Sequence, residues 1–86
     1  MTFTVLLERQ AERELLALPS QVVRRIDNRL RGLAEEPTPR GAIKLQGRET
    51  EGWRIRVGDY RILYTVDTAA RVVRVYRIRH RREAYR

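Results

Sequence analysis

The chain has 86 residues, 42% of them hydrophobic and 35% charged, which is typical of one folded domain, residues 1–86, with a heavily charged surface. The absence of cysteine excludes disulfides and thiolate metal sites, and a lone histidine argues against a histidine-based metal centre, so no metal or other cofactor is expected. Residues 44–86 hold twelve basic and five acidic side chains and so contribute +7 of the net charge of +8, which predicts a polyanionic partner, either nucleic acid or an acidic protein.

The N-terminal residues predict a short strand followed by a helix. Residues 3–7, FTVLL, form an apolar run rich in β-formers. Residues 8–18 change to a helical period. The side chains expected to face inward are Ala11, Leu15 and Leu18, and those expected mostly outside are Glu12, Arg13 and Glu14.

A second helix follows with almost no linker. Pro19 ends the first helix, Ser20 is a suitable N-cap for the second, and the second ends before Pro37. Its expected buried stripe consists of Val22, Val23, Ile26, Leu30 and Leu33. The two helices should therefore form an antiparallel hairpin whose apolar faces cover a sheet.

The second half of the chain predicts three further strands. Residues 36–52 are a loop region rich in Pro and Gly, with a short apolar contact at Ile43 and Leu45. The β-rich runs are 53–57, 60–66 and 72–78, and the tail, 80–86, can form a helical turn or extend a strand. The order β-α-α-β-β-β predicts an α+β domain with a small antiparallel sheet and the helical hairpin on one face.

Residues 53–64 read WRIRVGDYRILY, two β-rich runs joined by Gly58 and Asp59. Glycine takes the positive φ that a tight two-residue turn requires. This turn predicts the pairs Val57 with Tyr60, Arg56 with Arg61, Ile55 with Ile62, Arg54 with Leu63, and Trp53 with Tyr64. Alternation then places one apolar set toward the helices, made of Trp53, Ile55, Val57, Tyr60, Ile62 and Tyr64.

Three arginines of this hairpin, Arg54, Arg56 and Arg61, fall on the opposite face. Like charges directly across a strand pair destabilise a sheet by several tenths to about 1 kcal/mol, so the pattern favours an anion between them. Phosphate is the best candidate, because a planar guanidinium binds two phosphate oxygens and stays charged at physiological pH. The alternative is a solvated face whose long side chains splay apart into water.

The last strand and tail, VVRVYRIRHRREAYR, interleave basic and aromatic residues, which suits single-stranded nucleic acid. The residues expected to contact RNA are Lys44, Arg77, Arg79 and Arg82. Histidine is the residue type that exchanges protons near neutral pH, so His80 is a candidate for proton transfer, or alternatively a surface or packing residue. Tyr85 is either a stacking residue or an apolar anchor for the tail.

Three segments, KLQG at 44–47, GWRIRVGDYRILYTV at 52–66 and HRREAYR at 80–86, resemble the RelE branch of the RelE/ParE toxin superfamily. These proteins are the toxin halves of bacterial and archaeal type II toxin–antitoxin systems, and the resemblance covers essentially the whole chain. It implies a metal-independent, ribosome-dependent endoribonuclease. Such an enzyme directs the messenger RNA's own 2′-hydroxyl at the neighbouring phosphate.

The resemblance implies a catalytic site made of Arg54, Arg56, Arg61, Arg81 and Tyr85. Three of these, Arg56, Arg61 and Arg81, would stabilise the charge that develops on the phosphate, and Tyr85 would stack on or orient the base beside the cut. RelE proteins often have lysine at the first position, where it can act as a base. Arg54 is a poor base because arginine stays protonated, so His80 or a ribosomal group would take the proton, or charge stabilisation alone would suffice.

The resemblance also implies the partners of the chain. They are an acidic, RelB-like antitoxin that wraps around the toxin, the ribosome with its messenger RNA, and operator DNA bound only through the antitoxin. No apolar run reaches membrane-spanning length and the N-terminus lacks a signal-peptide pattern, so we expect a cytoplasmic location and no membrane partner.

Two other functions stay open from the sequence. One is a ParE-like toxin that inhibits DNA gyrase by binding, without a catalytic set of residues. The other is a plain basic nucleic-acid-binding module. This module is the weaker alternative, because the second helix mixes acidic residues with Arg24, Arg25, Arg29 and Arg31 and so lacks a uniformly basic face for the major groove.

Overall fold

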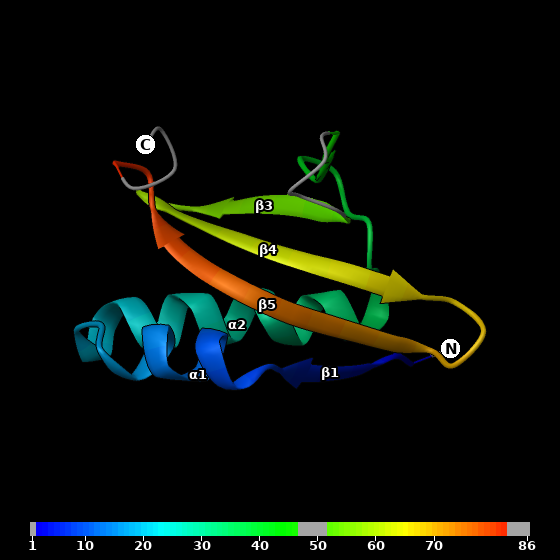
Figure 1. Cartoon of the computed structure of the whole chain (residues 1–86), viewed down its shortest axis with the longest axis horizontal. Helices are drawn as coiled ribbons and strands as arrows, with labels where there is room; N and C mark the ends of the chain where they lie inside the picture. Colours follow the sequence, from blue (N-terminus) through cyan, green and yellow to red (C-terminus); the bar gives the residue numbers. More distant parts are fainter. Residues whose placement is uncertain (1, 47–51, 83–86) are drawn as a thin grey trace.

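Two helices and five strands make up the part of the chain that the computed structural model describes, residues 2–46 and 52–82 (Figure 1). In chain order they are β1 (Thr4–Leu7), α1 (Arg9–Leu16), α2 (Ser20–Glu35), β2 (Ile43–Lys44), β3 (Trp53–Val57), β4 (Tyr60–Asp67) and β5 (Val72–His80). The strand order is β1-β5-β4-β3-β2, and the helical hairpin lies on one side of the sheet. The predicted α+β architecture is confirmed.

The sheet is mixed, whereas the sequence predicted a wholly antiparallel one. β1 pairs with β5 in parallel, and the other neighbouring strands are antiparallel. Parallel neighbours need a long connection, and the helices and the other strands supply it here. β2 was not predicted, because two residues are too few for a detectable pattern; Ile43 pairs with Arg54 there and is 49% exposed, so it makes little of the expected apolar contact.

The junction between the helices differs in detail from the sequence prediction. Ser20 is the first residue of α2 and not its N-cap; Pro19 occupies that position without a side-chain cap. The carbonyl of Pro19 accepts hydrogen bonds from the N–H groups of Val22 and Val23, both at 3.0 Å. Proline fits this position because its φ is fixed and the missing N–H would have no partner in the helix.

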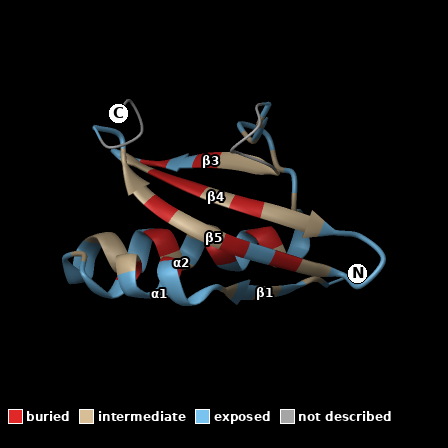
Figure 2. Cartoon of the chain, in the orientation of Figure 1, coloured by how far each residue is buried: buried red, intermediate tan, exposed pale blue. Residues whose placement is uncertain are grey.

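The core lies between the helices and the inner face of β3, β4 and β5 (Figure 2). Its members are Ala11, Leu15, Ile26, Leu30, Leu33, Ile55, Val57, Ile62, Tyr64, Val73, Val75 and Ile78. Every position expected to line the helical stripes is in this cluster or packs against it. No helix among the described residues is long and apolar enough to cross a membrane.

Tyr64 joins the sheet to the end of the helical hairpin. Its side chain is fully buried, and its hydroxyl donates a hydrogen bond of 2.7 Å to the carbonyl of Pro37. Burial raises the pKa of Tyr64 to about 12, and the nearby Arg29 opposes this shift only in part. The backbone of Tyr64 also lies against Gly52, which has φ of 90° and no room for a Cβ atom.

Candidate functional site

The hairpin of β3 and β4 has the predicted register. All five predicted pairs are present, from Val57 with Tyr60 to Trp53 with Tyr64, and Gly58 has φ of 58° in the turn. Ile55 and Ile62 are fully buried against the helices, as alternation requires. Arg56 and Arg61 consequently face each other on the outer side of the sheet.

A third arginine extends this pair across the next strand. Arg61 of β4 pairs with Arg79 of β5 on its other side, so Arg56, Arg61 and Arg79 form one row across three strands; we call it the arginine row. Arg61, in the middle, is only 8% exposed, whereas Arg56 is exposed. Placing three cations in one cross-strand row costs stability, and this cost is lowest when an anion binds the row.

A β-bulge in β5 brings Arg79 to the outer face. Tyr64 pairs with Val75 but Leu63 pairs with Arg77, so one extra residue, Tyr76, interrupts the register. Without this residue, the register from Tyr64 onward would put Ile78 opposite Arg61 and turn Arg79 toward the core. The alternation of residues 72–78 did not predict the bulge. The bulge is marked by the spacing of the buried apolar residues of β5. They occupy odd-numbered positions up to Val75 and then the even-numbered position of Ile78.

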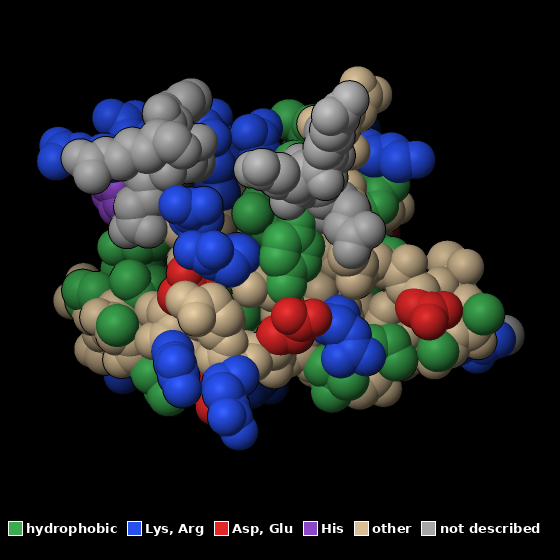
Figure 3. Space-filling view, in the orientation of Figure 1, with side chains coloured by type: hydrophobic (Ala, Val, Ile, Leu, Met, Phe, Trp, Pro, Cys, Tyr) green, Lys and Arg blue, Asp and Glu red, His purple; other side chains and the backbone are tan. Residues whose placement is uncertain are grey.

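Arg81 lies beside the turn of the hairpin, two residues beyond Arg79 of the arginine row. Its backbone N–H donates a hydrogen bond of 2.7 Å to the carbonyl of Asp59, and its Nε atom is 3.9 Å from Asp59 Oδ1. The backbone contact continues the pairing of β4 and β5 by one residue beyond His80. The structure thus gathers four arginines at this end of the sheet, in agreement with the blue side chains near the end of β5 in Figure 3.

Arg54 and Arg77 occupy the next row, on either side of Leu63. Arg54 is half-buried, and no acceptor among the described residues bonds its Nε atom. Arg77 instead forms an ion pair with Glu14 of α1, with Nη2 3.0 Å from Oε2. The side chain of Glu14 is 16% exposed, so the expectation that Glu14 lies mostly outside is wrong.

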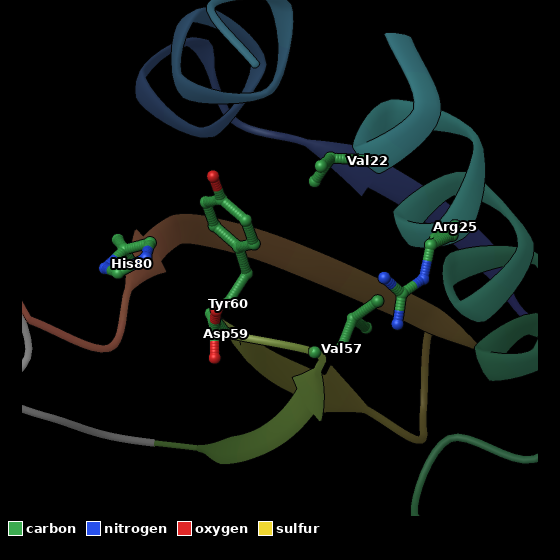
Figure 4. Close-up of a pocket in the computed structure, with 7 residues that line it drawn as sticks. Val22, Arg25, Val57, Asp59, Tyr60 and His80 are labelled. Atoms are coloured by element: carbon green, nitrogen blue, oxygen red, sulfur yellow. The ribbon is translucent and has the colours of Figure 1, made fainter. Parts of the chain in front are cut away.

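His80 lies on the helix side of the sheet, away from the arginine row. It pairs with Tyr60, and their rings meet edge to face, with centroids 5.2 Å apart and an interplanar angle of 87°. Both line a pocket of about 310 Å³ with Val22, Arg25 and Val57 (Figure 4). The bulge also causes this placement, because it turns His80 inward as it turns Arg79 outward.

Two other candidate residues, Lys44 and Arg82, do not join the arginine row. Lys44 pairs with Trp53, whose side chain packs toward the core. By register, Lys44 therefore lies on the inner face of the sheet. Arg82 is exposed, and its backbone N–H donates a hydrogen bond of 3.2 Å to Nδ1 of His80. Tyr85 lies outside the described residues. Within the ranges 2–46 and 52–82, no group of three or more His, Cys, Asp or Glu side chains is placed to hold a metal ion.

A family model described as the ParE toxin of the type II toxin–antitoxin system, parDE, matches residues 5–85. No curated protein matches the chain.

Solved structures of toxin–antitoxin proteins have the same fold. The archaeal RelE–RelB complex from Pyrococcus horikoshii contains a chain that is 33% identical; the match covers 94% of this chain and 97% of that one, with a TM-score of 0.82. The toxin–antitoxin complex RelBE of Mycobacterium tuberculosis gives 30% identity, coverage of 93% and 99%, and a TM-score of 0.81. A YoeB/ParE toxin from Agrobacterium tumefaciens shares the fold at 18% identity, with coverage of 91% and 98% and a TM-score of 0.77.

Proposed function

This chain belongs to the family of ParE toxins of type II toxin–antitoxin systems, and we propose that within this family it acts as a RelE-like endoribonuclease that cleaves messenger RNA on the ribosome. The observation that carries the proposal is the arginine row of Arg56, Arg61 and Arg79, with Arg81 beside it. Several guanidinium groups in one row on the open face of the sheet suit an RNA backbone, because each planar fork binds two phosphate oxygens.

Cleavage in this proposal uses a nucleophile that the RNA itself provides. The 2′-hydroxyl attacks the adjacent phosphorus, the bond to the 5′-oxygen breaks, and the products are a 2′,3′-cyclic phosphate and a free 5′-hydroxyl. Arg56, Arg61 and Arg81 bind the phosphate oxygens and stabilise the added negative charge of the pentavalent transition state. Arg79 joins them because it extends the same row. Tyr85 stacks on the base beside the cut.

The proton of the 2′-hydroxyl is transferred without help from His80. That ring is on the helix side of the sheet, whereas the arginine row is on the outer side. Arg54 adds charge next to the row but stays protonated, so it does not serve as a base. The reaction therefore rests on charge stabilisation and on the alignment of the RNA backbone. A ribosomal group or water accepts the proton of the 2′-hydroxyl, and water gives a proton to the departing 5′-oxygen.

We further propose that an acidic, RelB-like antitoxin inhibits the chain. Two solved relatives of at least 30% identity occur in complexes with antitoxins, and the net charge of +8 complements an acidic partner. Operator DNA is then bound through the antitoxin, and the site of action is the cytoplasm, where translating ribosomes are found.

The second candidate is inhibition of DNA gyrase, which the description of the matching family model favours. Primer extension on messenger RNA after brief induction in a host separates the two. Breaks at fixed codon positions that require translation, and that disappear in Arg81→Ala, support the ribonuclease. Intact messages together with accumulating gyrase–DNA breaks would contradict it and support the gyrase poison.

A further inference from the structure

Glu14 places a carboxylate on the apolar face of α1. It follows the fully buried Ala11 by three residues and precedes the buried Leu15, so it points toward the sheet with them. Its Oε1 atom accepts a hydrogen bond of 2.8 Å from the backbone N–H of Ile78. The Nε atom of Arg77 lies 3.1 Å from Oε2, and Nη2 lies 3.0 Å from the same oxygen.

This carboxylate occupies the edge of β5 where the neighbouring strand has ended. β1 pairs with β5 only as far as Val75, whose carbonyl accepts a 2.8 Å hydrogen bond from Glu8. Ile78 lies beyond that point, and Glu14 takes the place that a strand partner would have. The bulge residue, Tyr76, lies between the part of β5 paired with β1 and the part held by Glu14.

We propose that Glu14 is a positioning residue for the RNA-cleaving site: it holds the bulged half of β5 in the register that sets Arg79 beside Arg61. This inference rests on the proposed function. A one-residue slip of β5 would turn Arg79 inward and bring Ile78 opposite Arg61. Glu14 opposes the slip, because the slip would leave a largely buried carboxylate without its N–H donor and separate it from Arg77.

The same contacts assign a role to Arg77. Its charge is already balanced by Glu14, so Arg77 stabilises the carboxylate and does not serve as a primary phosphate contact. Arg79 instead extends the arginine row beside Arg61. Arg77 and Arg79, both predicted from the sequence to contact RNA, therefore act in different ways.

A double-mutant cycle tests whether Glu14 acts through Arg79. Ribosome-dependent cleavage is measured for the wild type, Glu14→Ala, Arg79→Ala and the double variant. Glu14→Ala is expected to lower kcat by about tenfold with little change in KM, because the row stabilises the transition state more than the bound RNA. The double variant should lose less activity than the product of the two single losses, because Glu14→Ala acts in part through Arg79. A multiplicative loss in the double variant would overturn the inference.

Two further variants separate positioning from RNA binding. Glu14→Gln keeps an oxygen that accepts from Ile78, so its kcat should stay within about threefold of the wild type. Arg77→Ala should leave KM unchanged, and a KM that rises several-fold would show that Arg77 contacts RNA directly. These two variants also test the inference if Glu14→Ala fails to fold. Glu12→Ala is the matched control, since it removes an exposed carboxylate from the same helix.

A readout without catalysis distinguishes failure of this inference from failure of the proposed function. Amide exchange of Ile78 and the cross-strand contact between the Hα atoms of Tyr60 and His80, the non-hydrogen-bonded pair next to Arg61 and Arg79, are followed by NMR. In Glu14→Ala the Ile78 amide should exchange at least about tenfold faster and the contact should weaken, whereas Glu12→Ala should change neither. Unchanged exchange and an unchanged contact overturn the inference, even if the wild type cleaves RNA. A wild type that does not cleave contradicts the proposed function alone.

Discussion

Arg56 is exposed on β3 and faces another arginine, Arg61, directly across the hairpin. A Thr at this position would suit a strand better and would remove the repulsion between the two guanidinium groups. The presence of an unfavourable residue at a position where many others would fold is the residue-scale reason to assign a function to this face. Binding sites commonly retain residues that lower stability.

Arg56→Thr should therefore separate stability from activity. We expect the free energy of unfolding of the variant to be higher by about 0.5 kcal/mol, because a like-charge pair is lost. We also expect the variant to cleave RNA at least about a hundredfold more slowly. Denaturant unfolding and the ribosome-dependent cleavage assay measure the two effects. Arg74→Thr is the control, because Arg74 is exposed on β5 and faces Thr65 instead of a cation. A destabilised Arg56→Thr, or one that cleaves normally, contradicts this assignment.

At the scale of the elements, the start of β3 depends on a close approach between two backbone segments. Gly52 precedes β3, has φ of 90°, and lies against the carbonyl of Tyr64 on β4. Its own carbonyl accepts a 2.9 Å hydrogen bond from Leu45, just beyond β2. This one residue thus holds β2, β3 and β4 together at the end of the sheet opposite the turn.

Gly52→Ala should lower the free energy of unfolding by at least about 2 kcal/mol. The new Cβ atom would overlap the carbonyl of Tyr64, and alanine is strained at this positive φ. Gly32→Ala is the matched control: nothing lies within 4 Å of its Cβ position on α2, and alanine should stabilise the helix by up to about 1 kcal/mol. Thermal and denaturant unfolding of both variants measure the difference. Equal effects would show that Gly52 is not constrained.

The bulge of β5 is also an element-scale feature, and it decides which of Arg79 and His80 shares the face of the arginine row. Strict alternation from Val75 would have placed Arg79 on the inner face of the sheet and His80 on the outer face. One extra residue, Tyr76, exchanges them. A proton-transfer role for His80 beside the arginines would have required β5 without the bulge.

At the scale of the whole molecule, the helical layer and the sheet are tied together by buried groups, including Tyr64. Its hydroxyl reaches the carbonyl of Pro37, just after α2, and burial raises its pKa to about 12 from an ordinary value of 10.0. An unfolded Tyr64 loses its proton near pH 10, whereas the folded one keeps it to about pH 12. The associated stability is fully present below about pH 10 and is lost as the pH rises through about 12.

The free energy of unfolding should fall between about pH 10 and 12, by up to roughly 2–3 kcal/mol from this residue, since one pKa unit corresponds to about 1.4 kcal/mol. Tyr64→Phe should be less stable by about 1 kcal/mol at neutral pH, because it lacks the hydrogen bond to Pro37, and its stability should decline less above pH 10. Tyr60→Phe serves as the control and should keep the decline of the wild type. Denaturant unfolding at a series of pH values measures these slopes. An equal decline in Tyr64→Phe would show that another group causes it.

The sequence by itself determined the features that depend on near neighbours in the chain. The two-residue turn at Gly58 and Asp59 and the alternation around it gave the register of β3 and β4 and placed Arg56 and Arg61 on one face. Helical periodicity and the prolines gave the hairpin of α1 and α2. These are local rules, in which spacing along the chain fixes position in space.

Only the tertiary structure decided how distant segments meet. The parallel pairing of β1 with β5, the face on which Arg79 and His80 lie, and the contact of Glu14 with Ile78 all join residues far apart in the sequence. No local pattern fixes such contacts, because their geometry depends on how the helical layer packs against the sheet. The hairpin supplied two arginines of the row from sequence alone, and the packed sheet supplied the third.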